Sequence, residues 1–383
     1  MLSHKQQVLK TMKYKNMNTE QILNQIFHER NISERTCKAY IISMRYFENI
    51  TCETLPTMLN IAETEEENNI RWKNCQLRKW LIQYRDWLSK KYKLKTLNLY
   101  LSTIIIVFRQ HDITVEQLPY FSTKTVKQSE YIYPEDLPTK KIIKDAISMT
   151  SPLLRALILF MSSSGLSRAD SLKLHIGDYL KATQHYHKTK TNIYKAIYEI
   201  HEHPEDVIPI FENLERQKTK QKYFTFCSPE AVDAINYYIL TREEPLSHNT
   251  PLFRIEETYV NKLFRDLNDM MRLGRVNNTS RFSPHMLRRF HATQLEKSGL
   301  SSESIDLLQG RKPHGVAHQS YIRVSKSRLR EEYIQALPYL MIEDINSVKT
   351  ELEITKEENK TLKDREDKLK NIMERLERLE QME

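Results

Sequence analysis

The scarcity of glycine restricts this chain more than any other feature, since it has six glycines among 383 residues. They form neither the G-x-x-x-x-G-K-[ST] sequence of a phosphate-binding loop nor the G-x-G-x-x-G sequence of a dinucleotide-binding turn. Both loops need glycine because the backbone must approach a phosphate closely. We therefore predict that the protein works without a nucleotide, and we expect no other cofactor.

Positive charge is concentrated in the first 342 residues. The formal net charge is +9, and the segment from Glu343 onward holds 13 acidic and 9 basic residues, a net charge of −4. The rest of the chain therefore carries +13. An excess of this size favours a polyanionic partner, with nucleic acid ahead of an anionic membrane surface.

The sequence shows no membrane span and no secretion signal. The longest apolar runs, "LSTIIIVF" and "LLRALILFM", fall well short of the ~20 residues that a span needs. The N-terminus is polar and basic, and the four cysteines form no C-x-x-C pair. We predict a cytoplasmic protein with no membrane partner.

Helical periodicity dominates residues 17–121, which follow an N-terminal tail of residues 1–16. Four large side chains of "SERTCKAYIISMRYF" are expected on one helix face, with Ser33 as the N-cap: Tyr40, Ile41, Met44 and Phe47. The runs "NNIRWKNCQLRKWLIQYRDWLSKKY" and "KTLNLYLSTIIIVFRQH" predict further helices. We expect a helical domain with a basic surface.

A polar stretch with two prolines, residues 122–139, predicts a linker with a helix start near Pro134. In residues 140–342, helical segments are interrupted by the runs "TNIYKAIYEIH" and "QKYFTFCS". Both are rich in β-branched and aromatic residues and predict strands. The predicted fold class is therefore mainly α with a small β-sheet, with a mixed α+β second domain.

Residues 343–383 predict a coiled-coil-like helix. From Val348 to Leu376, apolar residues recur four and three positions apart, with polar interruptions at Asn359 and Glu366. Such a seam serves either to pair protomers or to pack on its own domain, and the pattern leaves both alternatives open.

The sequence "RFSPHMLRRFHATQLEKSG", residues 281–299, interleaves basic and apolar side chains. Some of its cations must therefore approach a core, and a buried cation is costly unless an anion meets it. The stretch predicts an anion-binding site.

Five fragments of the second domain form an ordered set. They are "SSSGLSRADSLKL" with Arg168, "ERQKTKQKYFTFCSPEA" with Lys218, "SPHMLRRFHATQLEKSG" with His285 and Arg288, "IDLLQGRKP" with Arg311, and "VAHQSYIR" with Tyr321. In this order the set resembles the tyrosine recombinases, the phage-integrase family, and most of all the integrases of archaeal viruses and plasmids. The resemblance covers about residues 150–325 and extends more loosely to the helical N-terminal domain, which resembles the family's core-binding domain.

The resemblance implies a role for each residue in opening a phosphodiester without a metal. Arg168 and Arg288 would clamp the non-bridging oxygens, since guanidinium offers planar paired donors. Lys218 would protonate the leaving 5′ oxygen, and Tyr321 would attack phosphorus to give a 3′-phosphotyrosine. That linkage conserves bond energy, so rejoining would need no ATP.

His285 stands one helical turn before Arg288, so both can face one phosphate. Arg311 occupies a position that is often histidine in bacterial members, and we interpret it as a further phosphate donor. Its pKa prevents it from acting as a general base. The group that deprotonates Tyr321 is thus left open among His285, water and the local field.

The implied partners are double-stranded DNA attachment sites, joined by a homotetramer in a synaptic complex. One alternative is a type IB topoisomerase, and another is a catalytically silent DNA-binding regulator. The histidine pairs at 185–187 and 201–203 lack ligands to complete a site, so we predict no metal. Arg289 and His291 are interpreted as DNA-backbone or packing residues.

Overall fold

The computed structural model describes these parts of the chain: residues 14, 17–128, 130–189, 192–202, 207–217, 219–277, 279–311 and 325–343. Its contacts divide the chain into two units, Met1–Tyr131 and Ile132–Glu383. The division falls within the stretch 122–139 that the sequence predicts as a linker. The predicted coiled-coil-like helix of residues 343–383 lies, apart from its first residue, outside the described residues.

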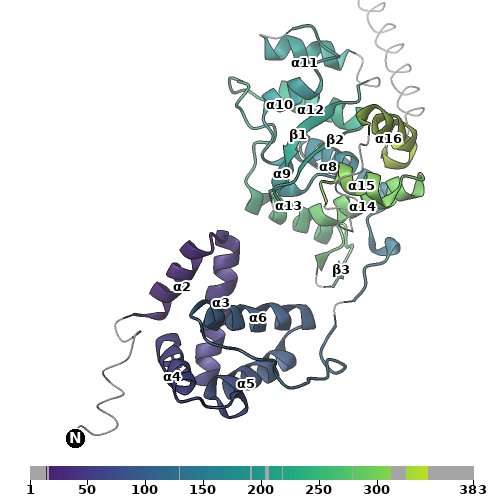
Figure 1. Ribbon diagram of the computed structural model, residues 1–383. Coiled ribbons are helices and arrows are strands. Elements are labelled where there is room, and N and C mark those ends of the chain that lie inside the picture. The colour runs from purple at the N-terminus through teal and green to yellow at the C-terminus, as the bar shows by residue number, and fades with distance from the viewer. Residues whose placement is uncertain are drawn as a thin grey trace, which may run out of the picture. The chain divides into compact units, whose positions relative to one another are not determined.

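The described part of the first unit is helical (Figure 1). Its elements are α2 (Thr19–Glu29), α3 (Glu34–Thr51), α4 (Leu55–Glu67), the 3-10 turn η1 (Trp72–Asn74), α5 (Gln76–Lys91) and α6 (Leu94–Gln110). Ser33 caps α3, because its side chain accepts a hydrogen bond from the backbone N–H of Thr36 at 3.4 Å. The predicted helices of this region are confirmed.

Aromatic side chains fill the core of the first unit. The ring of Phe47 lies edge-on to those of Tyr84 and Phe108, with centroids 5.1 and 6.2 Å away. One prediction for α3 is wrong, because Ile41 is 40% exposed and does not share the buried face of Tyr40 and Phe47. Adjacent helix positions are turned by about 100° from each other, so Ile41 falls outside that face.

Helices also dominate the described part of the second unit. They are the 3-10 turn η2 (Pro134–Asp136), α7 (Lys140–Ser148), α8 (Pro152–Ser164), α9 (Arg168–Ser171), α10 (Ile176–Ala182), α11 (Ile193–His201), α12 (Pro229–Leu240), α13 (Glu257–Met270), α14 (Pro284–Lys297), α15 (Ser302–Leu308) and α16 (Lys326–Leu340). Strand β1 (Ile210–Glu215) pairs antiparallel with β2 (Lys222–Phe226), and β3 (Arg275–Val276) with β4 (Thr279–Ser280). The fold class is mainly α with small β-sheets, as predicted. None of the described helices is long and apolar enough to cross a membrane.

The run "TNIYKAIYEIH" forms α11, so its prediction as a strand is wrong. Asn192 caps this helix by accepting a hydrogen bond from the Lys195 N–H at 3.0 Å. Ile193, Ile197 and Ile200 are buried three or four positions apart. The β-branched residues therefore line one face of a helix. The run "QKYFTFCS" contains strand β2, as predicted.

The helix start predicted near Pro134 is a single 3-10 turn, and the longer helix begins at Lys140. Helix α7 begins there because Thr139 is its N-cap, and the Thr139 hydroxyl accepts a hydrogen bond from the Ile142 N–H at 3.3 Å. Helix α7 therefore begins after the second proline of this stretch.

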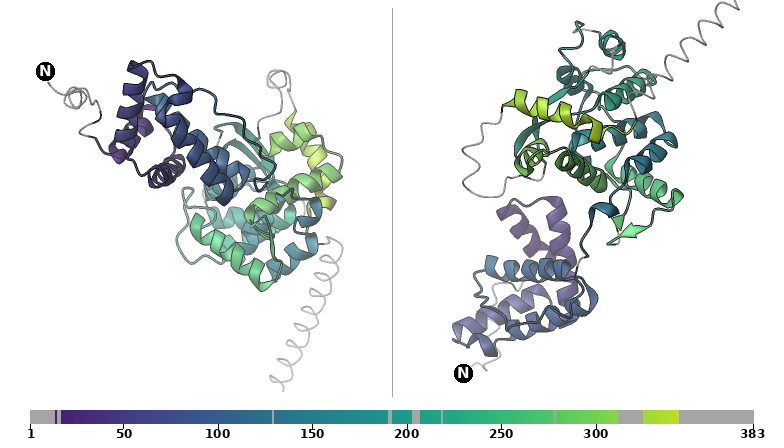
Figure 2. Two further views of the ribbon diagram at one scale, coloured as in Figure 1. Left: turned by 90° about the horizontal axis from the view of Figure 1, so that it is seen from below. Right: turned by 90° about the vertical axis from the view of Figure 1, so that its right-hand side faces the viewer.

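Helix α8 is the centre of the second unit. Every residue from Ala156 to Ser164 is buried, as expected of a helix that is covered on all sides. Helices α12 and α14 pack against it, and α16 packs on α14 (Figure 2). The helix ends at Gly165, whose φ of +66° lies in the left-handed region. The end of α8 thereby brings the "GLSRAD" sequence close to α14.

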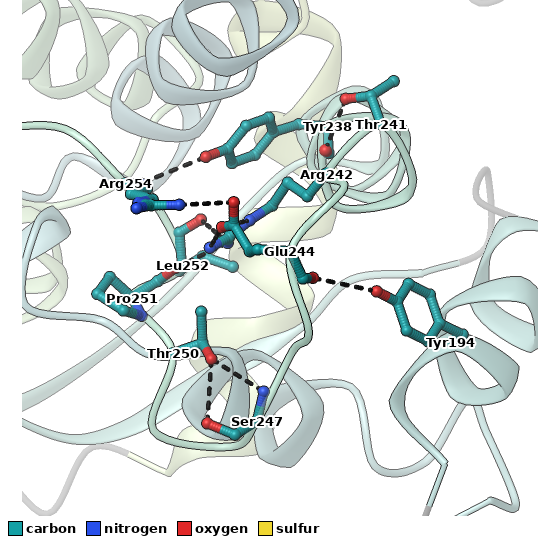
Figure 3. A network of polar contacts seen from close by, with 10 residues as sticks. All are labelled: Tyr194, Tyr238, Thr241, Arg242, Glu244, Ser247, Thr250, Pro251, Leu252 and Arg254. Carbon is teal, nitrogen blue, oxygen red and sulfur yellow. Dashed lines mark hydrogen bonds and ion pairs between the residues drawn. The ribbon is translucent and has the colours of Figure 1, made fainter.

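A buried arginine, Arg242, holds the loop between α12 and α13 (Figure 3). Its guanidinium donates hydrogen bonds to the Glu244 carboxylate and, at 2.9 Å, to the Pro251 carbonyl oxygen. Arg254 pairs with the same carboxylate at an N–O distance of 2.6 Å. We call Arg242, Glu244 and Arg254 the Arg242 network, and it fixes the chain that leads into α13.

Candidate active site

The basic sequence at residues 281–299 supplies α14 and two site residues. Ser283 caps the helix, its hydroxyl accepting a hydrogen bond from the Met286 N–H at 3.4 Å. Met286 and Phe290 are fully or almost fully buried, so this helix lies within the core of the second unit. His285 is exposed near the start of the helix, whereas Arg288, one turn later, is only 5% exposed.

Two carbonyl oxygens hold the Arg288 guanidinium. It donates a hydrogen bond to the Gly165 carbonyl oxygen at 2.5 Å and another to that of Gln309. Gly165 ends α8 and Gln309 ends α15, and a helix C-terminus carries a partial negative charge that favours a cation. Among the described residues Arg288 forms no ion pair, so carbonyl dipoles solvate its charge, and the charge of Asp170 also favours its protonated form.

The turn after α15 carries Arg311 and depends on Gly310. The φ of Gly310 is +59°, and a Cβ at this position would lie 2.6 Å from the ring of Tyr223 on β2. Only glycine meets both conditions without strain, which explains the glycine of "LLQGR". The side chain of Arg311 is 39% exposed and lies 3.5 Å from the Asp306 carboxylate.

A third arginine, which the sequence motifs do not single out, reaches the same turn. Arg216 follows β1, and its Nη1 donates a hydrogen bond to the Gly310 carbonyl oxygen at 3.1 Å. We call Arg216, Arg288 and Arg311 the guanidinium cluster. A signal for Arg216 exists in the sequence, because it stands two positions before Lys218 in "ERQKTK".

The charges of the guanidinium cluster oppose one another. Burial and the nearby guanidinium groups of Arg216 and Arg311 lower the pKa of Arg288 to about 10. Burial and the charge of Arg216 also lower the pKa of Arg311, although Asp306 opposes the shift. Arginine keeps its proton at neutral pH in proteins, so the cluster concentrates positive charge.

The same positive charge acts on His285. Partial desolvation, together with the charges of Arg289 and Arg288, lowers the pKa of His285 below its ordinary value of 6.5. The imidazole is therefore neutral at pH 7 and can accept a proton.

Buried Asp170 joins the α9 turn to the β-hairpin. Its carboxylate accepts a hydrogen bond from the Ser167 hydroxyl at 2.6 Å and another from the Gln217 N–H at 3.1 Å. Gln217 precedes Lys218 in the chain, so this carboxylate fixes the backbone that leads to the predicted general acid. The sequence offers a weak signal for Asp170, since it follows Arg168 by two residues in the same motif.

Arg168 contacts α13 in this structure. Its guanidinium donates hydrogen bonds to Asn261 and to Glu257, with which it forms an ion pair. The side chain of Arg168 is 22% exposed. The structure thus places His285, Arg288 and Arg311 near one another, whereas the described hydrogen bonds of Arg168 lead to another helix.

His291 is a packing residue. It is fully buried, and burial lowers its pKa to about 3, so the ring is neutral. Its Nδ1 lies 2.9 Å from the side-chain nitrogen of Gln309. A Cβ on Gly165 would lie 2.4 Å from the same ring, so His291 packs directly against the end of α8.

Two predicted site residues, Lys218 and Tyr321, lie outside the described residues. In the part of the chain that the structure describes, no group of three or more His, Cys, Asp and Glu side chains is placed to hold a metal ion. The described site is therefore a set of guanidinium donors beside a neutral imidazole. Such a set is suited to binding the oxygens of a phosphate.

Comparison with known proteins gives weak similarities to solved structures. No protein-family model matches the chain, and no curated protein matches its sequence. The integrase of transposon Tn1549 in complex with circular intermediate DNA is 13% identical, with a TM-score of 0.48 over 88% of this chain and 100% of that one. XerH site-specific recombinase bound to its difH substrate is 13% identical, with a TM-score of 0.47 over 83% of this chain and 80% of that one. XerA recombinase is 17% identical, with a TM-score of 0.32 over 82% of this chain and 96% of that one.

Proposed function

We propose that the protein is a site-specific DNA recombinase of the tyrosine recombinase type, which cleaves and rejoins duplex DNA through a 3′-phosphotyrosine. The observation that carries this proposal is Arg288, a buried cation that faces other cations and has no ion pair among the described residues. A buried charge of this kind is tolerated where an anion completes the site. The family resemblance of the five fragments supports a DNA phosphate as that anion.

In the proposed reaction the Tyr321 oxygen attacks phosphorus, and the bond from phosphorus to the 5′ oxygen breaks. The tyrosine proton passes to a base, and Lys218 gives a proton to the leaving oxygen. Arg288 and Arg311 neutralise the charge that builds on the non-bridging oxygens. The reverse attack by another 5′-hydroxyl restores the phosphodiester and frees the tyrosine.

His285 fits the role of the base. Its pKa is lowered, so it is neutral at pH 7, and it stands one turn from Arg288 on α14. Arg311 does not fit, because a guanidinium cannot give up its proton under these conditions. We further propose that four protomers join two DNA attachment sites, and that the reaction integrates or excises a mobile element.

Trapping of a covalent adduct tests the proposal. A library of nicked duplexes with random sequence is incubated with the protein in EDTA, and DNA that remains bound after denaturation is sequenced. We expect an adduct from the wild type and from Tyr339→Phe, a control at an exposed tyrosine of α16. Tyr321→Phe should give none, since only the nucleophilic oxygen is lost.

The outcomes separate the alternatives. An adduct from Tyr321→Phe would show that another residue is the nucleophile. Failure of the wild type to form any adduct would favour a silent DNA-binding regulator. Relaxation of a supercoiled plasmid without recombinant products would favour a type IB topoisomerase.

A further inference from the structure

We propose that the basic segment of residues 1–13, which lies outside the described residues, docks into an acidic pocket on the first unit of the same chain. The pocket belongs to the first unit, whereas the candidate active site belongs to the second. The inference therefore goes beyond the proposed function and stands without it.

The acidic pocket lies where the end of α4, the start of α5 and the stretch after α6 meet. Its apolar lining comes from Ala62, Ile70, Trp72, Leu77 and Ile113. Its volume is about 80 Å³, equal to about three water molecules, which is room for one apolar side chain. Ile70 is 41% exposed, so part of this apolar surface is open to an occupant.

Carboxylates also line the pocket. They belong to Glu65, Glu66 and Glu116, and backbone N–H groups hold the first two in place. Burial raises the pKa of the Cys75 thiol in the same pocket, and the charges of all three carboxylates raise it further, whereas Lys79 has a smaller opposite effect. The pocket therefore favours an occupant that combines an apolar side chain with positive charge.

Tyr14 fixes the end of the segment beside this pocket. It is 5% exposed, and its ring lies edge-on to that of His111 with centroids 5.3 Å apart. Its N–H donates a hydrogen bond to the side-chain oxygen of Asn60 at 3.5 Å. Asn60 precedes the pocket residue Ala62 by two positions on α4, and Ile113 follows His111 by two. The chain thus enters the first unit between two stretches that line the pocket.

The sequence of residues 1–13, "MLSHKQQVLKTMK", has the chemistry that the pocket favours. It holds three lysines and no acidic residue. Leu9 stands next to Lys10, so one apolar side chain and one cation are adjacent. A leucine in the pocket would remove its apolar surface from water, and the neighbouring lysine would face the carboxylates.

The length of chain between Leu9 and Tyr14 is sufficient. Five residues span about 8 Å in a helix and about 17 Å when extended. The six residues from Asn60 to Glu66 cover about 9 Å of α4. Leu9 can therefore reach the pocket from the position at which Tyr14 is fixed.

Tethering favours this occupant over a separate molecule. A short connection keeps the segment at an effective concentration on the order of millimolar, so that even weak docking is populated. A second copy of the chain would compete only at a similar protein concentration.

Trypsin cleavage after Lys10, followed by mass spectrometry of the full-length protein, tests the docking. Each cleavage rate is divided by the rate for a synthetic peptide of residues 1–16 with the same sequence, which gives the protection of the segment. We expect wild-type protection of about tenfold or more, and Leu9→Ser should remove most of it because the apolar contact is lost. Glu116→Lys should reduce protection by about threefold, because a cation would then face Lys10.

Two matched controls should keep the wild-type protection. Glu67→Lys makes the same change of charge on α4, at an exposed residue that does not line the pocket, and Gln7→Ser changes a polar residue of the segment. Cleavage of the wild type at the rate of the free peptide would overturn the inference, as would equal losses in Glu116→Lys and Glu67→Lys. Protection that increases with protein concentration would instead place the segment on a second copy.

Discussion

The Arg242 network and the guanidinium cluster place the same residue type in opposite surroundings. In the network, two arginines share the Glu244 carboxylate, and the hydrogen bond from Arg242 is the main cause that lowers the pKa of Glu244 (Figure 3). In the cluster, burial and neighbouring arginines lower the pKa of Arg288. In the Arg242 network the two arginines favour the charged form of Glu244. In the guanidinium cluster Arg216 and Arg311 disfavour the charged form of Arg288.

This difference separates a structural arginine from a binding arginine. In the Arg242 network two guanidinium groups share one carboxylate, and these contacts hold the loop before α13. In the guanidinium cluster only Arg311 has a described carboxylate partner, Asp306, whereas Arg216 and Arg288 donate to carbonyl oxygens. A buried arginine alone does not indicate a site, but neighbouring arginines of which two contact only carbonyl oxygens do.

The largest expected effect concerns the reaction. Arg288→Met should lower the rate of adduct formation by about 1,000-fold, or about 4 kcal/mol, because a donor to the transition state is lost. The free energy of unfolding without DNA should change far less, since repulsion within the cluster is relieved. Single-turnover trapping and urea unfolding measure the two quantities. A large loss of stability with ordinary cleavage would place Arg288 with the structural arginines.

The second-largest effect is expected for the corresponding substitution in the Arg242 network. Arg242→Met should lower the free energy of unfolding by about 3 kcal/mol, because it leaves carbonyl and carboxylate groups without their buried partner. Urea unfolding followed by circular dichroism measures it, with Arg254→Met as the control for the more exposed arginine of the network. If Arg242→Met and Arg288→Met changed stability equally, the contrast between the two regions would be lost.

A smaller effect is expected at the turn that gathers the cluster. Gly310→Ala should lower the free energy of unfolding by about 2 kcal/mol, because the new Cβ would meet the Tyr223 ring at a positive φ. Gly299→Ala is the control, since its φ of +95° is also positive but nothing lies within 4 Å of the added Cβ. The control should lose about 1 kcal/mol, the strain of the backbone alone. Equal losses would show that the packing of Gly310 on Tyr223 is unimportant.

The smallest effect concerns His285. Its pKa in the folded protein is lowered below 6.5, so the imidazole is neutral at pH 7 and gains its proton only at lower pH. Cleavage that needs a neutral base should therefore fall as the pH decreases through that pKa. Arg289→Gln should move the inflection upward towards 6.5, because it removes the charge with the largest effect on His285.

NMR titration of the His285 imidazole measures the same shift without relying on activity. Lys297→Gln, at the exposed far end of α14, should leave the titration unchanged. An inflection that does not move in Arg289→Gln would show that desolvation alone sets the pKa of His285.

Local patterns in the sequence predict the helices and the main strand well, and they fail where tertiary contacts decide. The run that forms α11 has the composition of a strand, yet Asn192 caps it and its isoleucines bury one helix face. Composition cannot distinguish these outcomes, because the burying surface comes from elsewhere in the chain.

At the candidate site, too, sequence patterns fail where contacts between distant residues decide. The interleaved cations of α14 predict a buried arginine, and Arg288 is buried. The motif that contains Arg168 does not reveal Glu257, which lies 89 residues further along and pairs with it. Arg216 is similarly hidden, because its relation to Gly310 depends on how the hairpin meets the end of α15.

The anchoring of Arg288 between two helix ends also has a consequence for synthesis on the ribosome. Its contact with Gly165 spans 123 positions, and the nearby hydrogen bond from the Tyr333 hydroxyl to Ser163 spans 170. Contacts so distant in sequence form late, after the intervening chain has closed. A nascent chain therefore holds its arginines far apart through most of translation. It acquires a concentrated positive charge only once the turn after α15 has emerged to receive Arg216 and Arg288.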